Sequence, residues 1–254
     1  MTGHINEDIF NYDIKRFQKF HSDLGFIKDR ITESLGDLYG MHWPYKQHTT
    51  SRNVKKLPYH NELKSFGACF GVSAGYERPM WFALDGEKAE YEYSYNYQNW
   101  YPSVEYETNN TLTNVGLYDL SPFSKFEIKS KKAHEDLQRI CTSNIKQEPG
   151  KCTYTHMLNK DGGIETDLTV VCIEQNHFRI ISSAATRERD KFHIKKHLSE
   201  GVELTDVTDD YCVFGIFGPK SRLLMQDISS EDFSNENLKR KLELINDTAG
   251  QRSA

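Results

Sequence analysis

The 254-residue chain lacks long hydrophobic runs, and this excludes the simplest kind of membrane protein. Its longest apolar runs, residues 168–173 and 211–217, are far shorter than the roughly 18 residues that a membrane-spanning helix requires. The amino terminus also lacks a basic segment followed by an apolar one, which is the pattern of a secretory signal. We therefore expect a cytoplasmic protein without a membrane partner.

Cysteine is scarce, and it is not arranged in pairs. The five cysteines stand singly at positions 69, 141, 152, 172 and 212, without a Cys-x-x-Cys spacing. An odd number in apolar surroundings is typical of reduced thiols rather than of a disulfide framework or a zinc site. His193 and His197 have the spacing of metal ligands on a helix, but no Glu follows His193 and no third ligand is evident. We predict no metal site.

Positive charge is not in excess either. The chain has 32 Lys and Arg against 37 Asp and Glu, a formal net charge of −5, which disfavours nucleic acid as a general partner. Four alternating tyrosines could stack bases, but the glutamates around them would repel a phosphate backbone. These tyrosines, which we expect in a strand or loop, are Tyr91, Tyr93, Tyr95 and Tyr97. No Gly-x-Gly-x-x-Gly occurs, so no dinucleotide-binding fold is expected in this chain.

The chain does contain a mixture of short strand patterns and helical patterns. Strands are predicted at residues 126–128, 152–158, 167–173, 178–183 and 211–217. Helices are predicted at residues 13–20, 26–39, 132–142, 187–198 and 219–227. This order indicates an α+β fold with antiparallel sheets and packed helices. The first two helices are too little for a domain, so exposed aromatic residues such as Phe26 and Trp43 should pack on the rest of the chain or on a partner.

One acidic residue, Asp167, has an unusual position. A turn-forming cluster, Asn159-Lys160-Asp161-Gly162-Gly163, joins two strand patterns, and Asp167 directly precedes the apolar run 168–173. Asp is a poor strand former and is costly to bury without a partner. The residue is therefore either an inward-facing polar group in a pocket or an exposed acid at the first position of a strand. The pattern alone leaves both interpretations open.

Several sequence blocks occur in the order that one family shows. They are Leu57-Pro58-Tyr59-His60, Gly67-Ala68-Cys69-Phe70-Gly71, Gly75-Tyr76-Glu77-Arg78-Pro79-Met80-Trp81-Phe82 and Val115-Gly116-Leu117-Tyr118-Asp119-Leu120-Ser121. With them, residues 13–234 resemble the folate-binding half of dimethylglycine and sarcosine dehydrogenases, which is similar to the aminomethyltransferase, or T-protein, of the glycine cleavage system. The stretch 38–44 resembles the end of the central domain that joins the FAD-binding part to the folate part in those flavoenzymes.

The resemblance implies three regions and a chemistry. Residues 1–55 would be the end of an FAD-dependent oxidoreductase central domain, 56–235 an incomplete aminomethyltransferase-like folate-binding domain, and 236–254 a divergent tail. The implied reaction is transfer of a one-carbon unit from a methylamine-derived imine to tetrahydrofolate. FAD would come only from a domain or a flavoprotein subunit outside this chain.

The resemblance also assigns roles to four residues. Asp167 stands where the family has an acid facing the N10 region of tetrahydrofolate, so we expect it to be the catalytic base or electrostatic stabiliser. Tyr154 matches a tyrosine of the pterin pocket, and its alternative role is to fill the core. Phe123 matches an apolar wall residue, and Val171 stands where the T-protein has a pocket-lining tyrosine. Ser183 replaces an asparagine of the T-protein, so no polar contact is carried over there.

The end of the chain and a basic cluster leave two classes of function open, a transfer module and a non-catalytic fragment. Relatives continue past Ser234 into a Tyr-x-Gly-Glu block whose glutamate holds the pterin, whereas this chain continues with a polar, charged stretch, so we expect a truncated end. A basic cluster at residues 187–196 could hold the glutamyl tail of folate or be a solvated helix face. The chain is therefore expected to be a folate-dependent transfer module or a non-catalytic fragment that docks a flavoprotein partner.

Overall fold

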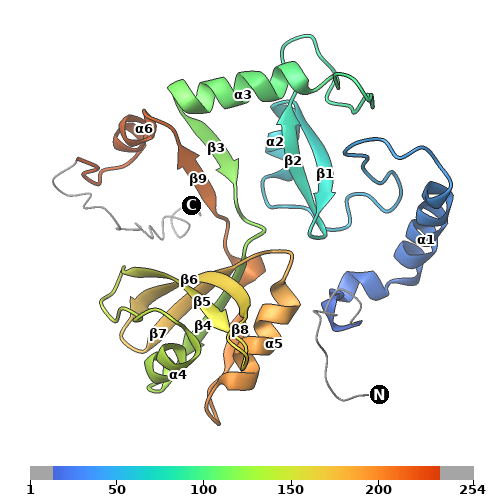
Figure 1. Cartoon of the computed structure of the whole chain (residues 1–254). Helices are drawn as coiled ribbons and strands as arrows, with labels where there is room; N and C mark the ends of the chain where they lie inside the picture. Colours follow the sequence, from blue (N-terminus) through green and yellow to red (C-terminus); the bar gives the residue numbers. More distant parts are fainter. Residues whose placement is uncertain (1–13, 235–254) are drawn as a thin grey trace, which may run out of the picture. The chain divides into compact units, whose positions relative to one another are not determined.

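The computed structural model describes residues 14–234, which form two compact units (Figure 1). Residues 14–122 and 211–228 make up unit 1, and residues 123–210 and 229–234 make up unit 2. Antiparallel sheets and helices occur in the described part of both units, which confirms the predicted α+β class.

The amino-terminal segment of unit 1 contains one long helix instead of the two that were expected. Two 3₁₀ turns, η2 (Ile14–Arg16) and η3 (Lys19–Ser22), replace the helix predicted at 13–20. Helix α1 (Leu24–Leu38) is capped by Asp23, whose Oδ1 accepts a hydrogen bond from the Phe26 backbone N–H at 2.8 Å. This side-chain cap satisfies a donor that the first helical turn cannot pair internally, and it fixes the start of α1.

The aromatic residues expected to be exposed in this segment are half-buried within unit 1. Phe26 packs edge-on against Phe20, with ring centroids 5.4 Å apart. Trp43 packs on Tyr95, with centroids 4.9 Å apart, and the tyrosine run around Tyr95 is an irregular loop. The amino-terminal segment therefore packs on the rest of its own unit.

Two small sheets and three helices complete unit 1. The hairpin of β1 (Ala68–Ser73) and β2 (Tyr76–Phe82) turns at Ala74 and Gly75, which both have positive φ, as a tight two-residue turn requires. Strand β3 (Gly116–Asp119) pairs with β9 (Phe214–Phe217). The helices are α2 (His60–Ser65), α3 (Tyr101–Thr113) and α6 (Ser221–Ile228).

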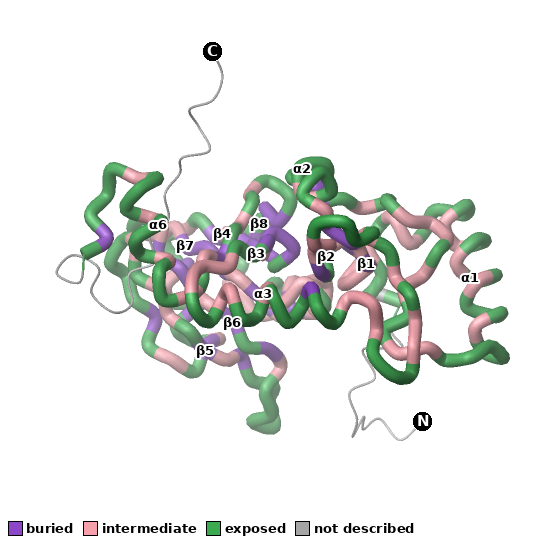
Figure 2. Tube along the Cα trace, turned by 90° about the horizontal axis from the view of Figure 1, so that it is seen from above, coloured by how far each residue is buried: buried purple, intermediate pink, exposed green. Residues whose placement is uncertain are grey.

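Unit 2 is built on a five-stranded antiparallel sheet with the strand order β5-β6-β7-β4-β8. The strands are β4 (Ser124–Lys129), β5 (Cys152–Leu158), β6 (Ile164–Glu174), β7 (His177–Ser182) and β8 (Leu204–Asp206). The 3₁₀ turn η4 (Thr208–Asp210) follows β8. Apolar side chains of one sheet face form a core with helices α4 (Ala133–Ile140) and α5 (Arg187–His197). Buried positions concentrate along these strands (Figure 2).

The cysteine and membrane expectations can be compared with the described residues. Cys69, Cys141 and Cys172 are buried, and the described part of the chain contains no disulfide. Burial raises the pKa of the Cys69 thiol to about 11 and that of Cys141 to about 12, which makes both poor nucleophiles. None of the helices within residues 14–234 is both long and apolar enough to span a membrane.

Candidate functional site

The second face of the unit 2 sheet carries the predicted catalytic acid. Side chains alternate between the two faces of a strand, and the neighbours Thr166 and Leu168 are buried on the core side. Asp167 consequently points to the opposite face, where it is exposed. Asp167 is therefore an exposed acid on unit 2 taken by itself, and its catalytic role remains a prediction.

The structure brings Tyr154 and Asp167 together. Tyr154 lies on the neighbouring strand β5, and its hydroxyl donates a hydrogen bond to Asp167 Oδ2 at 3.1 Å. This hydrogen bond stabilises the protonated phenol and is the main reason why the pKa of Tyr154 is raised. The tyrosine side chain is 62% exposed, so it does not fill the core, and its ring is accessible to a ligand.

The other two predicted residues differ in their distance from this pair. Phe123 directly precedes β4, which is three strands from β5, or about 14 Å at the usual strand spacing. Its side chain is 40% exposed. Val171 follows Asp167 by four residues on β6 and therefore shares its face, where it is fully buried opposite Cys152 and Arg179 in the pairing register. The pocket-lining roles of both residues remain predictions.

The pairing register adds a residue that the sequence pattern did not indicate. His156 on β5 lies directly opposite Asp167 on β6, so both side chains occupy the same face. The imidazole of His156 packs edge-to-face with the Tyr154 ring, with centroids 5.5 Å apart. The alternation of residues 154, 156 and 158 could have indicated a shared face, but only the register identifies His156 as the neighbour of Asp167.

Basic residues of the predicted cluster at 187–196 are engaged within unit 2. The Arg187 guanidinium makes two hydrogen bonds to Asp206, at 3.0 and 2.9 Å, and Lys191 Nζ lies 3.2 Å from the same carboxylate. Burial opposes ionisation of Asp206, but the hydrogen bonds from Arg187 and Thr208 hold its pKa at about 2. Arg187 and Lys191 therefore have an internal partner, whereas Lys195 and Lys196 are exposed.

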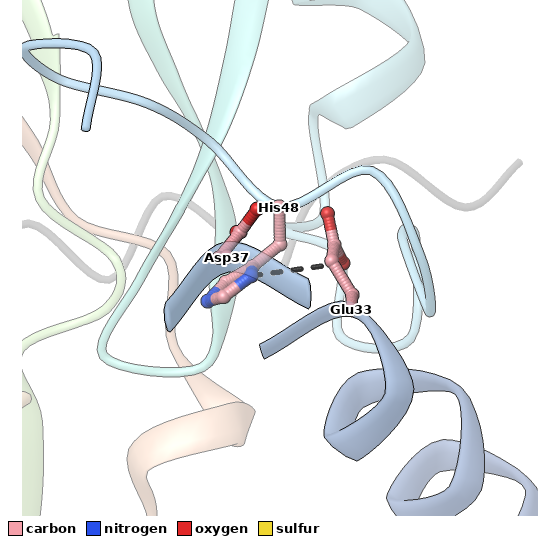
Figure 3. Close-up of side chains that lie close together, drawn as sticks. All are labelled: Glu33, Asp37 and His48. Carbon is pink, nitrogen blue, oxygen red and sulfur yellow. Dashed lines mark ion pairs between the residues drawn. The ribbon is translucent and has the colours of Figure 1, made fainter. Parts of the chain in front are cut away.

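A cluster in unit 1 has ligand types that could hold a metal ion. Glu33 and Asp37 on α1 meet His48 on the following loop (Figure 3). The two oxygens of Glu33 already accept hydrogen bonds from the backbone N–H groups and hydroxyls of Thr49 and Thr50. Asp37 is ion-paired with the Lys46 ammonium, which would repel a cation. We interpret the cluster as a set of hydrogen bonds and ion pairs that hold α1 against the loop.

Comparison with known families decides the relationship of the chain. The family model described as "GCVT N-terminal domain" matches residues 59–241. The chain belongs to the GCVT family. A second model, "FAD dependent oxidoreductase central domain", matches residues 2–56, so a short piece of that domain precedes the GCVT region. The predicted relationship to the aminomethyltransferase family is confirmed, and the predicted tail 236–254 lies outside the described residues.

Curated relatives of this GCVT chain are much longer proteins. "4-methylaminobutanoate oxidase (formaldehyde-forming)" of Paenarthrobacter nicotinovorans is 37% identical over 93% of this chain and 29% of that protein. Mitochondrial dimethylglycine dehydrogenase of Rattus norvegicus is 28% identical over 90% of this chain and 27% of that protein. Mitochondrial sarcosine dehydrogenase of Mus musculus is 27% identical over 92% of this chain and 30% of that protein. The chain thus spans less than a third of the length of these relatives.

A solved structure supports the fold. Aminomethyltransferase T of the glycine cleavage system from Bartonella henselae superposes with a TM-score of 0.56 at 21% identity, over 68% of this chain and 43% of that protein. At this identity the likeness shows the fold alone. It confirms the predicted aminomethyltransferase-like architecture.

Proposed function

We propose that this chain is the tetrahydrofolate-dependent one-carbon transfer module of a flavoenzyme of the dimethylglycine or sarcosine dehydrogenase type. The observation that carries the proposal is the Tyr154–Asp167 pair on the accessible face of the unit 2 sheet, in a chain of the GCVT family. The names of the relatives suggest an N-methylated amine as the source of the one-carbon unit. The FAD that oxidises such an amine would be bound by a further domain or by a flavoprotein subunit.

The geometry around Asp167 fits a role in proton transfer. Tyr154 occupies Oδ2 of the carboxylate, which fixes its orientation and leaves Oδ1 for a second donor. Tetrahydrofolate, when bound, supplies the nucleophilic nitrogen that captures the one-carbon unit. Asp167 would accept the proton that this nitrogen loses, and its charge would stabilise the cationic carbon–nitrogen group before capture.

Three neighbouring residues would shape the binding surface. The accessible Tyr154 ring can stack on the bicyclic pterin, and stacking on aromatic rings is favourable. Phe123 would be an apolar wall at the far side of the sheet. Val171 lies on the same face of β6 as Asp167 and is fully buried there, so it would be the apolar base of this surface.

Isothermal titration of the whole chain with tetrahydrofolate tests this proposal. We expect saturable binding, weakened at least tenfold by Asp167→Asn, because the substitution removes a charge that faces the ligand. Asp161→Asn is the matched control, since Asp161 is exposed in the turn of the same hairpin and should not affect binding. No detectable heat at millimolar tetrahydrofolate would contradict folate binding by this chain.

A second function is favoured by the amino-terminal segment of unit 1. Ile14, Leu24 and Tyr39 are 79%, 81% and 95% exposed, an unusual amount of exposed apolar surface for one short segment. A non-catalytic role would use this segment to dock a flavoprotein. Light scattering of the chain with and without a flavoprotein of the sarcosine dehydrogenase type distinguishes the two, because docking alone predicts a complex but no response to tetrahydrofolate.

A further inference from the structure

Unit 1 contains a cavity of about 270 Å³ between α3, β2 and β3. Helix α3 lines it with Tyr106, Glu107, Asn110 and Thr111, which share a helix face because they are spaced by about one turn. Gly116 allows β3 to approach α3, since a Cβ atom at this position would collide with the Thr111 side chain. The cavity walls are therefore fixed by regular secondary structure.

Asp119, the last residue of β3, gives the cavity a buried acceptor without a partner. The residue is only 9% exposed. Its Oδ1 accepts a hydrogen bond from the Ser121 backbone N–H at 2.9 Å, whereas Oδ2 is buried and has no hydrogen-bond partner in the described part of the chain. A carboxylate oxygen can only accept, and a buried one is strongly disfavoured unless a donor or a cation pairs with it.

A second acid makes the cavity suitable for a cation. Glu107 Oε1 accepts a hydrogen bond from the Phe82 backbone N–H at 2.7 Å; burial raises the pKa of this carboxyl, and a cation beside it would favour its charged form. Against the two acids, the lining residues described by the structure offer one cationic group, the guanidinium of Arg78, which is only half-buried. The local balance of acidic and basic groups therefore favours a positively charged ligand.

The remaining walls are apolar, and two of their aromatic rings are held in place by neighbouring side chains. Tyr118 shares a hydrogen bond with Thr111 through its hydroxyl at 2.9 Å, and its ring packs on Phe217 with centroids 5.4 Å apart. The ring of Phe214 packs on Tyr59 at 5.2 Å. Aromatic faces attract organic cations through the negative charge density of the ring, most strongly where water is excluded.

We propose that this cavity binds a small alkylammonium ion, with Asp119 pairing with its N–H groups and the aromatic rings contacting its alkyl groups. The volume is sufficient, because a cavity of roughly 150 Å³ already holds a benzene molecule. The site lies in unit 1 and involves no residue that the proposed function uses, so it extends that function instead of restating it.

Titration of the whole chain with diethylammonium chloride, followed by NMR, tests the site. We expect saturable shifts of unit 1 resonances with a dissociation constant of about 1 mM, since so small a ligand makes few contacts. Diethyl ether, which has the same shape without the charge, should bind at least tenfold more weakly. Equal binding of the ether, or no saturation at 50-fold higher concentration, would overturn the proposal.

Two variants separate the roles of charge and ring. Asp119→Asn should weaken binding at least tenfold, while Asp161→Asn in unit 2 should leave it unchanged. Tyr106→Ala provides a second variant that is expected to fold, because Tyr106 is 60% exposed, and it should weaken the ammonium ion more than the ether. Unchanged diethylammonium binding in a folded Asp119→Asn or Tyr106→Ala protein contradicts the proposal. Tetrahydrofolate binding should be unaffected in both variants, which makes the two proposals independently testable.

Discussion

At the scale of single residues, the hydrogen bond from Tyr154 to Asp167 changes how readily the tyrosine ionises. A phenol that donates to a carboxylate loses its proton less readily, so the pKa of Tyr154 is raised above its usual value of about 10. The partner amide in Asp167→Asn carries no charge, and we expect the Tyr154 pKa to fall back in this variant. Carbon-13 NMR of labelled tyrosine ring carbons measures the change.

The control for this measurement is Thr169→Val, which alters the residue paired with Tyr154 across the strands but keeps the Asp167 charge. An unchanged Tyr154 pKa in Asp167→Asn would mean that the hydrogen bond does not persist in solution. An equal shift in both variants would indicate a general effect on the sheet face.

The sequence predicted the identity of this acid but not its surroundings. The glycine-containing turn and the apolar run after it made Asp167 conspicuous, and the family blocks gave it a role. Whether its side chain is exposed depends on which face of β6 meets α4 and α5, and the position of His156 depends on the strand register. Both are properties of tertiary packing that a single strand pattern does not determine.

At the scale of elements, the Glu33 carboxylate connects α1 to the loop at residues 49–50 through hydrogen bonds. Hydrogen bonds from Thr50 and Thr49 lower the pKa of Glu33 to about 2, against the opposing effect of burial. A carboxyl whose pKa is lower in the folded state than its unfolded value of about 4.3 contributes stability above that value, and the contribution is lost as the pH falls toward 2. We expect Glu33→Gln to lower stability at neutral pH and to reduce the loss on acidification.

Urea unfolding at neutral and acidic pH tests this expectation. Asp29→Asn is the matched control, because Asp29 is exposed on the same helix. If the two variants showed the same dependence on pH, the hydrogen bonds to Thr49 and Thr50 would not be important for stability.

Elements of unit 2 were easier to predict than those of unit 1 for a physical reason. Strands β5, β6 and β7 place apolar side chains regularly on a core face, so their pattern is visible in the sequence. Helix α3 has only Ser103 fully buried, and its polar and aromatic residues show no clear apolar stripe. The helix predicted at 13–20 is wrong, because two 3₁₀ turns lie in this stretch and the regular helix starts only after the Asp23 cap.

At the scale of the whole molecule, the core of unit 2 should dominate its stability. Leu137 of α4 is fully buried against the sheet. Leu137→Ala removes buried methyl groups and leaves a cavity, which costs about 2–5 kcal/mol in such positions. Leu112→Ala in unit 1, where the side chain is 70% exposed, should change stability by less than about 0.5 kcal/mol.

Hydrogen exchange of the whole chain measures both effects and assigns them to a unit. We expect Leu137→Ala to lower amide protection in β4 to β7, since these strands contact the same core. A loss of protection in Leu112→Ala as large as in Leu137→Ala would contradict the division into an apolar core and a tolerant surface.

The chain passes from unit 1 into unit 2 and back at two points that are close together within unit 1. The chain leaves unit 1 just after β3 and returns just before β9, and these strands are paired neighbours. The Leu120 backbone N–H also donates a hydrogen bond to the Val213 carbonyl at 2.8 Å. The segment that follows β3 and the segment that precedes β9 are therefore adjacent. Residues 123–210, the larger of the two segments of unit 2, are thus inserted between neighbouring strands of unit 1, and a short turn in their place would close β3 and β9 into an ordinary hairpin. Recombination at these two points could replace residues 123–210 while β3 and β9 stay paired.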